Sequence, residues 1–144
     1  MGEKGFFIYI DGAARGNPGI AGIGIIIKDG QGRKIKQLYK YIGEATNNIA
    51  EYTALVYGLQ EALILGLKDV VACSDSELLV KQLNGEYRVK NSNLRPYYEQ
   101  FLHLKTGFNR LEIKQIGREE NRESDKLANK AVDSRVDSSL KSAE

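Results

Sequence analysis

This sequence has one cysteine, Cys73, one histidine, His103, and no tryptophan among its 144 residues. A single cysteine excludes an intramolecular disulfide and a cysteine-based zinc site. No apolar run approaches the roughly 18 residues that span a bilayer, and Asp11 follows the first apolar run too closely for a signal peptide. We therefore expect a cytoplasmic protein without a membrane partner.

The chain also has little net charge, +2 from 21 basic and 19 acidic residues. This balance is too weak to predict a nucleic-acid partner by itself. The length predicts a single domain, because domains typically take about 100–200 residues, and a core of that size folds without covalent staples. We expect a monomer in which residues 1–132 form the domain and residues 133–144 a polar C-terminal tail.

The hydrophobic pattern begins with three strands. Residues 5–10 form a continuous apolar run that stops at Asp11, which is typical of a central strand covered on both faces. The glycine-rich segment 12–19 is predicted to be a turn. Two further strands follow at 20–28 and 34–42, so the three form an antiparallel meander.

Helical periodicity takes over at residue 48. Apolar stripes on two sides of residues 48–67 predict a mostly buried helix, with small residues that allow close approach. The pattern after it predicts a strand, a short helix, a basic connection, a helix, a strand and a last helix, at 69–74, 76–83, 84–93, 93–108, 111–116 and 121–132. This order predicts an α/β fold with helices on both faces of a five-stranded mixed sheet, in which three antiparallel strands precede two parallel ones.

Four carboxylates occupy positions that could meet at one edge of this sheet. Asp11 and Asp75 each follow an apolar strand, and the two strands are expected to be parallel neighbours. Glu51 lies in the first turn of the central helix, and Asp125 near the start of the last one. Converging carboxylates repel one another unless a cation is present. Oxygen ligands without histidine or cysteine suit Mg²⁺ or Mn²⁺.

Each acid also has a purely structural interpretation. Glu51 could complete a capping box with Asn48 as the helix N-cap, and Asp75 could cap the short helix that follows it. Asp125 could complement a helix dipole, and Asp11 could open a glycine turn. Taken singly, these interpretations are at least as good as the functional one, so only the combination of all four acids favours a metal site.

Four blocks around these acids match one known family in order and spacing. They are Asp11-Gly12-Ala13-Ala14-Arg15-Gly16-Asn17-Pro18-Gly19, Thr46-Asn47-Asn48-Ile49-Ala50-Glu51, Ser74-Asp75-Ser76 and Asn121-Arg122-Glu123-Ser124-Asp125-Lys126-Leu127-Ala128-Asn129. They resemble the motifs D-G-[SA]-x-x-x-N-P-G, T-N-N-x-x-E, [ST]-D-S and N-x-x-[AS]-D-x-L-A of the type 1 ribonuclease H family. That family cleaves the RNA strand of RNA–DNA hybrids, and the resemblance covers residues 6–132.

The resemblance implies a role for each matching position. The catalytic quartet that binds two Mg²⁺ ions, or Mn²⁺ in their place, would be Asp11, Glu51, Asp75 and Asp125. The positions that match contacts to the nucleic acid are Gly12, Asn17, Asn47, Asn48 and Ser76. The family's products carry 5′-phosphate and 3′-hydroxyl ends, and its selection of RNA has to come from the 2′-hydroxyl groups.

The loop before the last helix departs from the family. Many members have a histidine there, whereas this chain has Arg118 at about that place, and His103 lies inside a predicted helix. Arg118 could hold a substrate phosphate or form a surface ion pair, but it cannot shuttle protons near neutral pH. A histidine-free loop resembles the archaeal-like and plant-associated branch of the family. Some of that branch also cut double-stranded RNA, which stays open for this chain.

The segment that handles the substrate is also reduced. Several members insert a long basic helix with tryptophan after the third acid, where this chain has the short connection 84–93. Around it, Glu86 stands against four basic side chains, a local excess of +3, from Lys81, Arg88, Lys90 and Arg95. Such a patch is often only solvated surface, but beside a nuclease cleft we favour contact with the DNA strand.

Three functions compete. The first is a Mg²⁺-dependent endonuclease acting on RNA–DNA hybrids. The second is a non-catalytic relative that binds nucleic acid, but all four acids are present. The third is a DNA transposase or junction resolvase of the same superfamily, but those lack the T-N-N-x-x-E and N-P-G blocks. The sequence favours the first.

Overall fold

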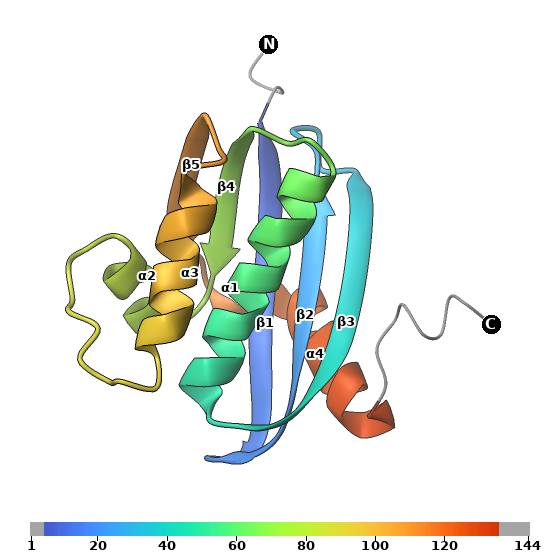
Figure 1. The fold of residues 1–144 in the computed structure, drawn as a ribbon. Coiled ribbons are helices and arrows are strands. Elements are labelled where there is room, and N and C mark those ends of the chain that lie inside the picture. Colours follow the sequence, from blue (N-terminus) through green and yellow to red (C-terminus); the bar gives the residue numbers. More distant parts are fainter. Residues whose placement is uncertain (1–4, 136–144) are drawn as a thin grey trace.

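The computed structural model describes residues 5–135, and within them five strands form one mixed sheet (Figure 1). They are β1 (Phe6–Gly16), β2 (Gly19–Lys28), β3 (Lys34–Ala45), β4 (Asp69–Ser74) and β5 (Arg110–Gln115). The order across the sheet is β3-β2-β1-β4-β5, in which β1–β2 and β2–β3 are antiparallel and β1–β4 and β4–β5 are parallel. The expected fold class and the central place of the first strand are thus confirmed.

Helices cover both faces of the sheet, also as expected. They are α1 (Asn47–Ile64), α2 (Glu77–Leu83), α3 (Arg95–Lys105) and α4 (Arg122–Ser134), with the 3₁₀ turn η2 (Arg118–Asn121) before α4. Figure 1 shows α1 lying across β1 and β2 with α3 beside it, whereas α4 packs behind β1, β2 and β3. In residues 5–135, no helix combines the length and the apolar character that crossing a membrane requires.

The glycines between the isoleucines of β2 explain how α4 approaches the sheet. Successive side chains of a strand point to opposite faces, and the isoleucines on the α1 side join the main core at Ile23, Ile25 and Ile27. On the other side, a Cβ added to Gly24 would collide with the Ser124 carbonyl oxygen and lie 2.7 Å from the Ala128 nitrogen. Helix α4 can therefore lie directly on β2 only because Gly24 has no side chain.

Strand β1 is longer than the sequence pattern predicts. It continues past Asp11 to Gly16, because these residues keep an unbroken antiparallel register with β2 as far as the pair Gly16–Gly19. The predicted turn over 12–19 is therefore wrong for its first five residues. Pairing of β1 with β4 stops earlier, at Tyr9–Cys73. Asp11 thus lies within a strand on the β2 side but beyond the last pair on the β4 side.

The last helix is also longer than expected. Helix α4 continues to Ser134, two residues beyond the predicted end of the domain at residue 132. The rest of the expected C-terminal tail, 136–144, lies outside the described residues.

Replacing Gly24 with alanine should destabilise the fold by about 3 kcal/mol, because the added methyl group meets the backbone of α4, which cannot move aside as a flexible side chain can. Urea or thermal unfolding measures the change. The control is Gly5→Ala, since nothing lies within 4 Å of a Cβ there, and it should shift stability by less than about 0.5 kcal/mol. Equal stability of the two variants would contradict the close contact between α4 and β2.

Candidate active site

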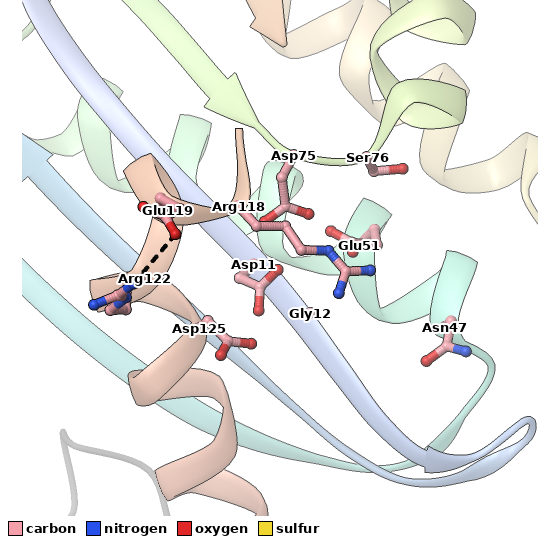
Figure 2. Close-up of a pocket in the computed structure, with 10 residues that line it drawn as sticks. All are labelled: Asp11, Gly12, Asn47, Glu51, Asp75, Ser76, Arg118, Glu119, Arg122 and Asp125. Carbon is pink, nitrogen blue, oxygen red and sulfur yellow. Dashed lines mark ion pairs between the residues drawn. The ribbon is translucent and has the colours of Figure 1, made fainter. Parts of the chain in front are cut away.

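The four predicted acids line a single cleft (Figure 2). Its volume is about 630 Å³, and its walls are Asp11, Gly12, Asn47, Glu51, Asp75, Ser76, Arg118, Glu119, Arg122 and Asp125. These side chains come from the middle of β1, the start of α1, the turn after β4, and the η2–α4 segment. One carboxylate oxygen from each of Asp11, Glu51 and Asp75 lies within 4.8 Å of the other two. Asp125 faces this group from α4 (Figure 2).

Parallel pairing of β1 and β4 brings Asp11 and Asp75 together. The last pair between these strands is Tyr9–Cys73, and each acid follows two residues later in its own segment. The two strands therefore deliver the two carboxylates to the same level of the sheet, at the carboxyl end of β4. This is the arrangement that the sequence predicts, although it arises inside β1 rather than at its end.

Gly12 brings Glu51 to the same place. A Cβ on Gly12 would lie 2.6 Å from both the Ala50 oxygen and the Glu51 nitrogen, so the first turns of α1 rest directly on the backbone of β1. The Gly12 N–H group also lies close enough to the Glu51 carboxylate to lower its pKa. Sequence reasoning assigned Gly12 only to the substrate, whereas the structure shows that it is needed for the packing of Glu51.

The acids strongly perturb one another. Burial of Asp11, which is 5% exposed, together with the charge of Glu51, a hydrogen bond donated to Asp125 and the charge of Asp75, raises its pKa to about 10. Burial and the charge of Asp75 raise the pKa of Glu51 to about 8, although the Gly12 N–H group and the Arg118 guanidinium oppose this. Without a cation, the cluster cannot be fully ionised at neutral pH.

The donor set fits a divalent cation. Within residues 5–135, Glu51 Oε1 is the one buried side-chain oxygen that accepts no hydrogen bond. A buried carboxylate oxygen without a donor is costly, and a cation would satisfy it while relieving the repulsion between the acids. Carboxylate oxygens from Asp11, Glu51 and Asp75, without histidine or thiolate, suit Mg²⁺ or Mn²⁺.

Three of the four structural interpretations of the acids are wrong. The N-cap of α1 is Thr46, whose Oγ1 accepts from the Ile49 N–H group at 3.1 Å, so Asn48 and Glu51 form no capping box. The N-cap of α2 is Ser76 rather than Asp75. Asp11 opens no turn because it is paired within β1. The interpretation of Asp125 as a dipole partner is compatible with the structure, since it lies in the first turn of α4.

Comparison with known proteins agrees with this geometry. A family model described as reverse transcriptase-like matches residues 9–131. The ribonuclease HI of Halobacterium salinarum is 40% identical over 125 residues, 87% of this chain and 63% of that protein. The crystal structure of RNase H1 from this archaeon superposes with a TM-score of 0.88 at 38% identity, covering 90% of this chain and 98% of that one.

The chain belongs to the type 1 ribonuclease H family. LC11-RNase H1, in a crystal structure with an RNA/DNA hybrid, gives a TM-score of 0.87 at 41% identity over 90% of this chain and 98% of that one. The bifunctional protein Rv2228c of Mycobacterium tuberculosis is 37% identical over 138 residues, 95% of this chain. The chain spans only 38% of the length of that relative.

The predicted substrate residues of this family member divide into two groups. Those that line the cleft are Gly12, Asn47, Ser76 and Arg118. Asn17 and Asn48 do not line it but are exposed beside it. The Asn17 side-chain oxygen, Oδ1, accepts from the Asn47 backbone N–H group at 2.9 Å, which ties the β1–β2 turn to the start of α1. His103 is exposed in the last turn of α3 and does not line the cleft.

Sequence reasoning missed three residues at the site. Glu119 and Arg122 line the cleft and form an ion pair of 3.7 Å (Figure 2). The sequence could have indicated Arg122, because this residue precedes Asp125 by three positions on one helix and therefore lies on the same helix face. Asn121 is buried behind the cleft and contacts Asp75. Its position in the fourth motif was visible, but its contact depends on the tertiary fold.

The basic patch near residues 84–93 is weaker than its sequence indicates. Lys81 pairs with Glu86 at 3.6 Å and with Glu77 at 4.0 Å, and Arg95 pairs with Glu99 at 3.5 Å. Within the part of the chain that the structure describes, Arg88 and Lys90 form no ion pair. These two are the cations of the patch that a nucleic acid could engage without displacing an acid.

The raised pKa values predict that the metal-free protein loses stability as the pH rises. Above about pH 5 the unfolded chain has released these protons, whereas the fold still binds them at Glu51 and Asp11, with pKa values of about 8 and 10. The free energy of unfolding therefore falls with increasing pH. Asp11→Asn removes one of these acids and should raise the Tm in EDTA and flatten its decline between about pH 5 and 8.

Asp29→Asn is the matched control for this measurement. The N–H groups of Arg33 and Gln31 lower the pKa of Asp29, so its loss should reduce stability above about pH 4 rather than increase it. Thermal unfolding at several pH values compares the two variants. An Asp11→Asn protein with the pH dependence of the wild type would show that the acids do not strain the fold.

Proposed function

We propose that this chain is an endonuclease that hydrolyses the RNA strand of RNA–DNA hybrids and leaves 5′-phosphate and 3′-hydroxyl ends. The observation that carries this proposal is the meeting of four carboxylates in one open cleft, with a buried oxygen of Glu51 that lacks a partner. The likeness to LC11-RNase H1, whose crystal structure contains an RNA/DNA hybrid, supports the same substrate class.

We infer that two Mg²⁺ ions, or Mn²⁺ in their place, would be held by Asp11, Glu51, Asp75 and Asp125. When bound, such ions would activate the attacking water and stabilise the leaving 3′ oxygen. Asp11 is the best candidate for a shared ligand, because it is the most buried of the four and interacts with each of the other three.

The chain's own residues would orient the substrate in the cleft. The Arg118 guanidinium points toward Glu51 and lowers its pKa, so it lies where a phosphate next to the acids could be bound (Figure 2). Asn47 and Ser76 line the same cleft, and Asn17 and Asn48 are exposed beside it. These amides and hydroxyls are the groups suited to 2′-hydroxyl recognition, which separates RNA from DNA.

Double-stranded RNA is a further substrate to test. Among residues 5–135, Arg88 and Lys90 are the two cations of the patch without an ion pair. Two cations are a small basis for selecting DNA over RNA in the second strand. We propose that the protein acts as a cytoplasmic monomer.

Labelled RNA–DNA hybrid, plain DNA and double-stranded RNA, each incubated with Mg²⁺ or Mn²⁺, test the proposal directly. Hybrid cleavage is expected, and Asp11→Asn should reduce it by more than about 100-fold, beyond the usual loss for a residue that merely supports a metal ligand. Binding of the hybrid should be largely retained, since the basic side chains of the patch around residues 84–93 are unchanged. The control Asp29→Asn lies in the β2–β3 turn and should keep full activity.

Two results would contradict this assignment. Absence of hybrid cleavage by the wild type in both metals would overturn the proposed activity. Full activity of Asp11→Asn would show that the four acids are not the catalytic centre.

Hybrid binding should weaken steeply with salt. If about four phosphates are contacted, raising the salt from 50 to 200 mM should cost about 100-fold in affinity. Replacing both Arg88 and Lys90 with alanine should reduce the magnitude of the slope of log K against log[salt] by about 2. Lys81→Ala is the control, because Lys81 is already paired with glutamates and should change the slope less. Fluorescence anisotropy measures each slope, and a flat response of the wild type would contradict the patch.

A further inference from the structure

The side chain of Asn121 joins several parts of the site from behind. It is 1% exposed and lies at the junction of η2 and α4. Its Nδ2 group donates to the Ile10 carbonyl oxygen at 2.8 Å and to Asp75 Oδ2 at 3.0 Å, and its Oδ1 atom accepts from the Ser124 hydroxyl at 2.6 Å. Both amide protons and the amide oxygen are therefore used.

This set of bonds requires an amide in one orientation. Ile10 and Asp75 both offer acceptors, so the group between them has to donate twice. On the opposite side of the amide, the fully buried Ser124 hydroxyl lies 2.6 Å from Oδ1 and 3.1 Å from the Asn121 backbone oxygen, and its donation to Oδ1 supports the orientation that the two acceptors require. An aspartate at position 121 would place an acceptor oxygen against the Ile10 carbonyl oxygen and Asp75 Oδ2, which are both acceptors. An alanine would leave these two oxygens without the donors that Asn121 supplies.

The Asn121 amide bridges the place where β1 and β4 separate. Backbone pairing between the two strands ends at Tyr9–Cys73, one residue before Ile10 and two before Asp75. The two N–H bonds of Asn121 therefore connect the strands just beyond their last backbone pair. Because Ile10 precedes Asp11 directly, the bridge restrains how far apart Asp11 and Asp75 can lie.

We propose that Asn121 is a positioning residue that sets the separation of Asp11 and Asp75 and thereby the affinity of the cleft for a divalent cation. It binds neither cation nor substrate in this role. Its bond occupies Oδ2 of Asp75 and leaves Oδ1 available, which orients the carboxylate as residues behind metal ligands commonly do. This inference rests on the proposed function, since it takes the acids to be cation ligands.

Titration of the whole chain with Mn²⁺ in the absence of nucleic acid, with free Mn²⁺ measured by electron paramagnetic resonance, tests the role apart from catalysis. Asn121→Ala should raise the Kd for Mn²⁺ by about 10- to 100-fold. Ser124→Ala keeps both donors but loses the group that orients them, so it should raise the Kd by a smaller factor. Hybrid cleavage by Asn121→Ala should recover as the Mg²⁺ concentration is increased.

Gln82→Ala is the matched control. Gln82 is a buried amide of the same kind, because it accepts from the Tyr52 hydroxyl at 2.8 Å and donates to the Arg88 carbonyl at 3.4 Å, but it contacts none of the acids. It should lower thermal stability, as Asn121→Ala does, and leave the Kd for Mn²⁺ unchanged. A loss of Mn²⁺ affinity through general destabilisation would appear in both variants and would overturn the proposal.

The remaining outcomes separate this role from the proposed function. A folded Asn121→Ala protein, judged by circular dichroism, that binds Mn²⁺ as the wild type does would overturn the positioning role alone. If Asn121→Ala does not fold, wild-type affinity of Ser124→Ala would do the same. A wild-type protein that neither binds Mn²⁺ nor cleaves the hybrid would overturn the proposed function and this inference with it.

Discussion

Repulsion between the carboxylates that gather around the buried Asp11 side chain is the constraint on which the rest of this structure depends. Asp11 lies within the central strand, nearly inaccessible to water, and Glu51, Asp75 and Asp125 surround it in the cleft. Such an arrangement is unfavourable when the acids are ionised and favourable once a divalent cation is bound. The fold therefore has to hold the acids together against their own charge, and several of its unusual contacts do this.

Close backbone approach is the main means of doing so. Gly12 lets the first turns of α1 rest on β1, which brings Glu51 to the cluster, and Gly24 lets α4 rest on β2, which brings Asp125. Asn121 ties the separating ends of β1 and β4 through hydrogen bonds instead. A contact between backbones cannot yield as a long side chain can, so the positions of the acids are set by rigid elements.

The small net charge of the chain is consistent with a site of this kind. A sum of formal charges treats every acid as unfavourable for nucleic-acid binding. That sum includes the four acids that would bind cations next to the substrate. Lys81 and Arg95, two of the four cations of the patch around residues 84–93, are paired with nearby glutamates. Attraction to a polyanion would thus depend on bound metal and on a few arginines and lysines rather than on a broad basic surface.

The sequence by itself determined the order of strands and helices, the central place of the first strand and the four predicted acids that line the cleft, because hydrophobic period and motif spacing are local properties. It could not determine that β1 continues through a glycine-rich segment, since pairing with β2 overrides the local preference for a turn. Nor could it show that Thr46 rather than Asn48 caps α1, or that Asn121 binds Asp75 across 46 residues. Only the tertiary structure decided these, because each depends on which distant groups a backbone or side chain meets after folding.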